Sequence, residues 1–167
     1  MGKDTSQFLT IIEEHQGIIT GLCNAYYSSF EDRKDVRQEV ILQLWKSFPS
    51  FRGESKLSTW LYRVSLNTIL SRRRNEQRVR NTHYRSQHNK TDCCYDDDNE
   101  LLNYLLSTLK DEDKAILILQ LEGYKNHEIA TILGLTTTNV STRLHRIKSA
   151  LRDKLKLRIY GHSKAEK

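Results

Sequence analysis

The sequence predicts an all-α protein made of two small helical domains joined by a flexible linker, with a helix-turn-helix in the C-terminal domain. Leu, Ile, Lys, Arg, Glu and Gln recur at helical spacing. Alternation of β-branched residues is scarce, and the single proline is Pro49. A charged stretch with few aliphatic residues separates two halves that both have apolar patterning, and 167 residues suffice for two small domains.

Residues 1–80 are expected to form the first domain. Its opening helix places a row of apolar side chains on one inner side: Phe8, Leu9, Ile12, Ile18, Ile19, Leu22 and Tyr26. The inner residues of a second helix, from about residue 32 to 48, are Val36, Val40, Ile41, Leu44, Trp45 and Phe48. A long helix then runs from about Lys56 to beyond Arg74, and its buried side holds Leu57, Leu61, Val64 and Thr68.

The second helix carries a further stripe of Asp35, Gln38, Glu39, Leu42 and Lys46, at spacings i, i+3, i+4, i+7 and i+11. A leucine among charged and hydrogen-bonding groups suggests a docking surface for a protein. DNA is a poorer partner because its phosphates would repel the two acids. The alternative is an ordinary solvated face with one stray leucine.

The long helix has a mixed stripe beside its apolar face, made of Lys56, Trp60, Arg63, Asn67, Ser71 and Arg74. Cations, an aromatic ring, an amide and a hydroxyl in one row suit single-stranded nucleic acid, because rings stack on exposed bases and guanidinium groups hold the backbone. Trp60 lies at the edge of the apolar face, so a core role for it is the alternative.

Residues 81–99 are expected to be a flexible charged linker. A basic run from 71 to 90 adjoins an acidic run from 92 to 100, and almost no aliphatic residue lies between Val79 and Leu101. Such a segment cannot bury enough surface to order itself. A metal site built from His83, His88, Cys93 and Cys94 is conceivable by ligand type, but the spacing is not that of a known zinc module. Thiols that happen to fall in a linker are the simpler interpretation, with no metal bound.

Residues 100–160 are expected to form the second domain, followed by a disordered tail at 161–167. Within it, residues 126–144 have the pattern of a helix-turn-helix: Ala130 is small at the helix crossing, Gly134 can take positive φ at the bend, and Thr136 can cap the second helix. The shared apolar core is Ile129, Leu133, Leu135, Val140 and Leu144. From 141 to 158 there are seven basic residues and one acid, which favours phosphate binding. A plain helical packing unit is the alternative.

The whole chain is basic, with a net charge of +6 and a pI near 9.2, which favours a nucleic-acid partner. No stretch approaches the ~20 apolar residues that span a bilayer, and the N-terminus is polar, so we expect a cytoplasmic protein without membrane insertion. Three cysteines with two adjacent do not form a disulfide framework. Walker-type, zinc-hydrolase, deaminase and Gly-x-Ser-x-Gly motifs are missing, so we expect no catalysis and no cofactor.

Residues 35–45 and 51–64 resemble region 2 of the extracytoplasmic-function (ECF) group of bacterial RNA polymerase sigma factors. Residues 111–154, with Gly123 and Tyr124 before the helix-turn-helix, resemble region 4 of the same group. The resemblance covers about residues 7–80 and 100–155, in the family's order. It implies a factor that recruits core RNA polymerase to promoters and helps open the DNA.

The resemblance also implies roles for individual residues. Contact with the polymerase β′ clamp helices would involve Asp35, Gln38, Glu39 and Leu42. The residues that would capture the minus-ten element are Phe51, Arg52, Gly53, Glu54, Ser55, Lys56, Trp60, Arg63 and Asn67. Those that would contact the minus-thirty-five duplex are Thr137, Thr138, Asn139, Ser141, Thr142, Arg143 and Arg146. The polymerase β flap and an anti-sigma factor are further partners that the family implies.

Two positions depart from the family pattern. Lys125 stands where a capping serine is common, so we expect Asn126 to cap the first helix of the motif and move its start by one residue. Ser141 stands where a basic residue is frequent, which removes one phosphate contact. A free-standing helix-turn-helix regulator is the alternative function, but it leaves the stripes of the first domain as coincidences.

Overall fold

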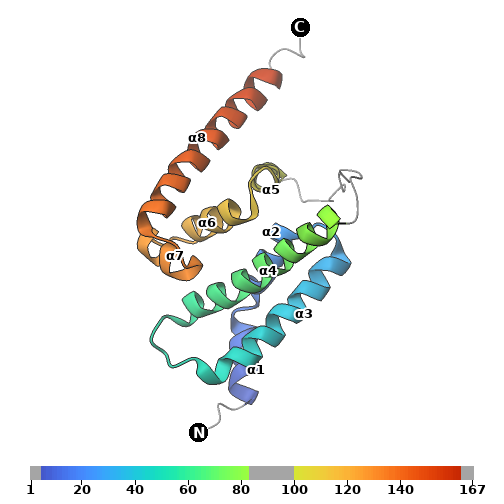
Figure 1. Cartoon of the computed structure of the whole chain (residues 1–167), viewed down its shortest axis with the longest axis vertical. Helices are drawn as coiled ribbons and strands as arrows, with labels where there is room; N and C mark the ends of the chain where they lie inside the picture. Colours follow the sequence, from blue (N-terminus) through green and yellow to red (C-terminus); the bar gives the residue numbers. More distant parts are fainter. Residues whose placement is uncertain (1–4, 83–99, 163–167) are drawn as a thin grey trace. The chain divides into compact units, whose positions relative to one another are not determined.

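A computed structural model of the chain describes residues 5–82 and 100–162. The chain divides into two compact units, Met1–Glu100 and Leu101–Lys167. Across the described residues the regular structure is helical, with no strand, which confirms the predicted all-α class. The described residues of the first unit form α1 (Thr5–Glu14), α2 (Gln16–Tyr26), α3 (Phe30–Ser47), the short 3-10 helix η1 (Phe48–Ser50) and α4 (Leu57–Thr82) (Figure 1).

The single opening helix expected from the sequence is wrong, because the chain forms α1 and α2 with a break at His15. The apolar row is also narrower than expected. Phe8 is 4% exposed and packs against the rings of Trp45 and Phe48, with centroids 5.0 and 5.4 Å away. Its neighbour Leu9 is 54% exposed, since adjacent helical residues diverge by about 100° and only one of them can face the bundle.

Helix α3 begins where Ser29 accepts a hydrogen bond from the backbone of Asp32 at 3.5 Å, an N-cap that the acids of the first turn reinforce. The predicted inner row is confirmed at four positions, which are all buried: Val36, Val40, Leu44 and Phe48. Ile41 is half-buried. Trp45, predicted to point inward, is 40% exposed, although its ring packs edge-on against that of Phe8.

Helix α4 packs against both α2 and α3, and Figure 1 shows it running alongside α3. Its buried arc is therefore broader than the sequence suggested, and it is turned relative to the expected row. The fully buried residues are Leu61, Ser65, Leu66 and Ile69, whereas Leu57, Val64 and Thr68 are half-buried. Of the expected inner residues of this helix, only Leu61 is completely covered.

The second unit contains α5 (Glu100–Ser107), α6 (Asp111–Leu121), α7 (Asn126–Leu133) and α8 (Thr137–His162). The core of this unit includes Leu106 from α5, Ala115, Ile116 and Leu119 from α6, Ile129, Ala130 and Ile132 from α7, and Val140, Leu144 and Ile147 from α8. Leu133 and Leu135, expected in the core, are half-buried. Helix α8 extends past residue 160, where the domain was expected to end.

The helix-turn-helix geometry is confirmed at three residues. Gly134 has φ 68°, a left-handed conformation that a side chain would strain, and the N–H of Leu135 returns to the carbonyl of Ala130 at 2.9 Å. Ala130 is buried at the crossing. Thr136 caps α8, since its hydroxyl accepts from the N–H of Asn139 at 3.2 Å.

The expected Asn126 cap is wrong. Helix α7 begins at Asn126, with Lys125 in the cap position. A lysine cannot accept a hydrogen bond, and the Glu128 carboxylate instead accepts from the Lys125 backbone N–H at 2.8 Å. The Asn126 amide is used elsewhere, because it donates to the hydroxyl of Ser141 on α8 at 2.9 Å.

Candidate docking and nucleic-acid surfaces

The stripe expected to dock a protein lies on the outer side of α3. Asp35, Gln38 and Leu42 are exposed, with Leu42 at 49%, and Glu39 is half-buried. Lys46 continues the stripe and is also exposed. An exposed leucine surrounded by groups that form hydrogen bonds has the composition of a contact surface with polar edges.

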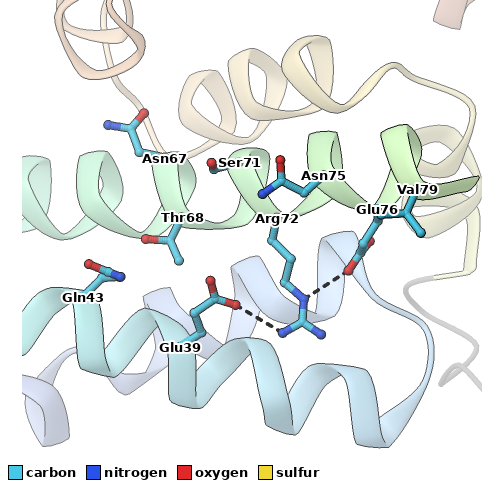
Figure 2. A pocket seen from close by; sticks show the side chains of 9 residues that line it. All are labelled: Glu39, Gln43, Asn67, Thr68, Ser71, Arg72, Asn75, Glu76 and Val79. Atoms are coloured by element: carbon cyan, nitrogen blue, oxygen red, sulfur yellow. Dashed lines mark hydrogen bonds and ion pairs between the residues drawn. The ribbon is translucent and has the colours of Figure 1, made fainter. Parts of the chain in front are cut away.

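Glu39 differs from its neighbours because a residue of α4 holds its carboxylate. Its Oε2 lies 3.2 Å from Nη1 of Arg72, whose Nε lies 3.0 Å from Oε1 of Glu76 one turn further along the same helix. Figure 2 shows Arg72 reaching from α4 to Glu39, with Glu76 on its other side. Burial alone would lower the pKa of Arg72, but the hydrogen bonds that its guanidinium donates to the Glu76 and Glu39 carboxylates outweigh burial and raise that pKa.

Tyr27, the residue that follows α2, completes this cluster. Its hydroxyl donates to Oε1 of Glu76 at 3.3 Å, and the guanidinium carbons of Arg72 and Arg73 each lie 5.6 Å from the centre of its ring. Burial, followed by the charge of Glu76, raises the pKa of Tyr27 far above its ordinary value. The cluster therefore joins three elements of the unit around one guanidinium.

A groove of about 720 Å³ lies along α3 and α4 beside this cluster (Figure 2). Its walls carry uncharged hydrogen-bonding side chains, the charged residues of the cluster and one valine: Glu39, Gln43, Asn67, Thr68, Ser71, Arg72, Asn75, Glu76 and Val79. Glu39 belongs to the predicted docking stripe and Asn67 to the predicted nucleic-acid stripe. One groove thus contains a residue of each predicted surface.

The loop before α4 and its first turns carry the residues expected to capture DNA bases. Most of these side chains are exposed: Arg52, Glu54, Ser55, Lys56, Arg63 and Asn67. Gly53 has φ 77°, which glycine adopts without strain. Glycine therefore suits the bend that this loop makes at residues 53–55.

Trp60 is only 8% exposed, and its ring lies among Phe48 and Phe51, at 6.2 and 5.0 Å between centroids. This burial favours the core role that the sequence left open. Phe51 stacks on Trp60 at an interplanar angle of 30° and is itself half-buried, so it offers the more accessible ring. The buried Trp60 ring lies against the Phe51 ring and supports it.

In the second unit, the start of α8 presents polar side chains to solvent. The exposed residues of the predicted set are Thr137, Thr138, Asn139, Ser141, Thr142 and Arg146. Arg143 behaves differently: its guanidinium pairs with Glu112 at 2.7 Å and with Asp113 at 3.3 Å, and its side chain is 24% exposed. It ties α8 to the first turn of α6.

Three of these contacts were not predicted from the sequence. The pairing of Arg72 with Glu76 has the i, i+4 spacing of a helical ion pair and could have been proposed. Its pairing with Glu39, and that of Arg143 with α6, join residues 33 and 31 positions apart, which no local pattern reveals. The thiols and imidazoles of the conceivable metal site, His83, His88, Cys93 and Cys94, lie outside the described residues.

Two family models match the chain in succession. The model of sigma-70 region 2 matches residues 11–79, and that of sigma-70 region 4 matches residues 99–151. The chain belongs to the sigma-70 family. The two matches fall on the two helical units and together cover most of the sequence.

Curated relatives identify the group within this family. RNA polymerase sigma factor YlaC of Bacillus subtilis is 28% identical over 160 residues, covering 83% of this chain and 92% of the relative. The ECF RNA polymerase sigma-E factor of Haemophilus influenzae is 28% identical over 176 residues, covering 91% of this chain and 89% of the relative. This sigma factor is a member of the ECF group.

Solved structures share the fold. The sigma factor RpoE from Bartonella quintana, in complex with the anti-sigma factor NepR, superposes with a TM-score of 0.68 at 19% identity, covering 91% of this chain and 96% of that one. CnrH, in complex with the cytosolic domain of CnrY, gives 0.65 at 19% identity, covering 92% and 90%. In the described part of this sigma factor, no helix is long and apolar enough to cross a membrane.

Proposed function

We propose that this chain is a promoter-directing subunit of RNA polymerase: it binds the core enzyme, brings it to specific promoters and helps open the DNA for initiation. The observation that carries this proposal is the presence of both sigma-70 regions on one chain, each on its own helical unit and in the family's order. A free-standing regulator would need the second unit alone. The exposed surfaces of the first unit would then have no use.

The outer stripe of α3 docks on the β′ clamp helices in this proposal, through Asp35, Gln38, Glu39 and Leu42. Leu42, exposed in the free protein, becomes the apolar contact at the centre of the interface, and the acids and the amide around it supply directional hydrogen bonds. Repulsion between the acids and DNA phosphates keeps nucleic acid away from this face.

The loop at 51–56 and the first turns of α4 capture the opened minus-ten strand. Phe51 offers a ring on which a base stacks, Trp60 supports that ring, and Arg63 and Lys56 hold the backbone. Asn67 presents an amide to a base edge from the groove wall. Contacts with unstacked bases offset the few kcal/mol that unstacking costs.

The start of α8 enters the major groove at the minus-thirty-five element in this proposal. Thr137, Thr138, Asn139 and Thr142 are free to contact bases or phosphates, and Arg146 is an exposed cation one turn beyond them. Arg143 has a different role, because its ion pairs with α6 fix the angle of α8 against that helix. Ser141 likewise joins α8 to α7 through Asn126.

The proposal includes a cytoplasmic location, no catalysis by the chain itself, and two further partners. The polymerase β flap would bind the second unit. An anti-sigma factor is supported by the solved relatives, of which one is bound to the anti-sigma factor NepR. The isolated protein binds promoter DNA weakly, because its two DNA-contacting units reach their proper separation only on the polymerase.

Run-off transcription with bacterial core RNA polymerase free of other sigma factors tests the proposal, with the region upstream of the protein's own gene as template. We expect a specific transcript that the double substitution Gln38→Ala/Glu39→Ala abolishes. The matched control is Glu13→Ala/Glu14→Ala, an adjacent exposed pair on α1, which should leave the transcript unchanged. Absence of a transcript, together with no co-migration of the protein with core enzyme, would favour the free-standing regulator.

A further inference from the structure

The residue at the centre of the cluster on α4 is immobilised. Arg72 contacts carboxylates through two of its nitrogens, Nε to Glu76 and Nη1 to Glu39, and its guanidinium lies against the Tyr27 ring. Tyr27 is 6% exposed and its hydroxyl also binds Glu76, so the inner end of the cluster is set in the core of the unit. A guanidinium held in this way cannot follow a ligand outward.

Glu39 lies at the outer end of the same cluster. Its side chain is 41% exposed, so one edge of the carboxylate faces Arg72 while the remainder faces solvent. On α3 it sits next to Gln38 and one turn from Asp35 and Leu42, which are all exposed. Among the residues of the proposed docking stripe that the structure describes, Glu39 is the one paired with a cation on another helix.

We propose that Arg72 is a positioning residue of the docking surface, which holds the Glu39 carboxylate in the orientation that core RNA polymerase binds. This inference rests on the docking role proposed for Glu39. Arg72 itself does not contact the polymerase. It acts through Glu39, and Glu76 and Tyr27 act one step further back by holding Arg72.

The chemistry of the two groups explains why an arginine suits this role. A guanidinium is a planar fork with fixed hydrogen-bond directions, so it sets the position and the plane of a carboxylate, whereas an ammonium group acts as a point charge. A free glutamate has three rotatable bonds, and a partner that binds it must first order them. Arg72 leaves Glu39 already ordered.

The charges of the cluster decide whether Arg72 favours or opposes the binding of core RNA polymerase. Arg72 and Arg73 face Glu39 and Glu76 within the cluster, two cations against two acids. Arg72 therefore leaves no excess positive charge to repel a cation of the partner. Because Glu76 and Tyr27 retain the guanidinium, Glu39 can accept further hydrogen bonds from a partner without giving up Arg72, since a carboxylate has about four acceptor sites.

The expected gain in affinity for core RNA polymerase follows from the ordering of the Glu39 side chain. Immobilising one long side chain at an interface changes affinity by roughly 2- to 13-fold. We therefore expect Arg72→Ala to raise the Kd for core RNA polymerase about fivefold. Arg72→Lys should give an intermediate Kd, because lysine keeps the charge and loses the fork.

A double-mutant cycle on the full-length protein tests the inference. The Kd for core enzyme is measured for the unaltered chain, Arg72→Ala, Glu39→Gln and the double variant, with urea unfolding of each at equilibrium as the measure of stability. Arg33→Ala is the matched control, an arginine of α3 that lies outside both predicted stripes and donates to the side chain of Asn24 on α2 at 3.3 Å. It should leave the Kd within twofold.

The inference predicts that Arg72→Ala weakens core binding about fivefold when Glu39 is present and less than twofold in the Glu39→Gln background. An equal loss of affinity in both backgrounds would show that Arg72 acts through stability or another contact. Tighter binding by Arg72→Ala would show that the arginine masks Glu39. Either result overturns the inference. If Glu39→Gln leaves the Kd unchanged while the protein still supports specific transcription, the inference fails and the proposed function stands. If the unaltered protein does not bind core enzyme, the proposed function itself fails.

Discussion

Replacement of Arg143 by alanine separates a structural from a DNA-binding role for the most buried cation at the start of α8. The guanidinium makes two ion pairs with α6, at 2.7 Å to Glu112 and 3.3 Å to Asp113. Partly exposed pairs contribute about 0.2–1 kcal/mol each, so their loss should lower the free energy of unfolding by about 1 kcal/mol. For a unit of this size, such a change lowers Tm by roughly 4–8 °C.

The comparison variant is Arg146→Ala, which removes the same charge from an exposed side chain of the same helix. If Arg146 contacts a phosphate, its loss reduces the slope of log K against log salt by about 0.9, with little change in Tm. Arg143→Ala should show the opposite pattern: a lower Tm and an unchanged slope. Thermal unfolding followed by circular dichroism, and promoter binding by the reconstituted polymerase between low and physiological salt, provide the two readouts.

The reasoning is refuted if Arg143→Ala reduces the salt slope by about one unit and leaves Tm unchanged. That result would mean that Arg143 leaves Glu112 and Asp113 to bind DNA. A loss of both stability and slope would mean that the ion pairs and a phosphate contact coexist, and the proposed positioning role would be incomplete.

Three further predictions concern the stability of the two units. Ser65 is fully buried, and its hydroxyl has no hydrogen-bond partner among the residues that the structure describes, so Ser65→Ala should raise the free energy of urea unfolding by about 1 kcal/mol. A decrease would contradict this account. Gly134→Ala should destabilise the second unit by about 1 kcal/mol because φ at this position is 68°, and Gly134→Asn should destabilise it less. Thermal unfolding measures both variants. If both were as stable as the parent protein, the position would not require a left-handed conformation. Burial raises the pKa values of Tyr27 and Cys23 in the folded state, so above about pH 9 to 10 these groups ionise in the unfolded state first and the free energy of unfolding should fall. Tyr27→Phe should flatten this fall in a pH series of urea titrations. An unchanged fall would mean that other groups cause it.

Local signals predicted the helix-turn-helix well. Gly134 and Thr136 act within one turn of their own positions, and the observed φ and cap hydrogen bond agree with the expectation. The inner row of α3 was also predictable, because Val36, Val40 and Leu44 recur at helical spacing and all three are fully buried.

Tertiary packing accounts for what the sequence did not reveal. The break at His15 lies inside an apolar pattern that continues on both sides, and Leu9 and Trp45 differ from their predicted burial because neighbouring helices cover only part of each face. The Arg72 and Arg143 pairs depend on how helices distant in sequence are juxtaposed. Residue type showed that these arginines could bind acids or phosphates, and only the fold shows which partner each one has.

The opening of promoter DNA tests the central claim most directly, because it requires polymerase docking and base capture by the same chain. Permanganate reactivity of thymines can be mapped on the region upstream of the protein's own gene, with core enzyme alone, the protein alone, and both together. The account predicts reactive thymines at the minus-ten element only when both are present. Reactivity with core enzyme alone, or its absence when both are bound to the DNA, would contradict the proposed role in promoter opening.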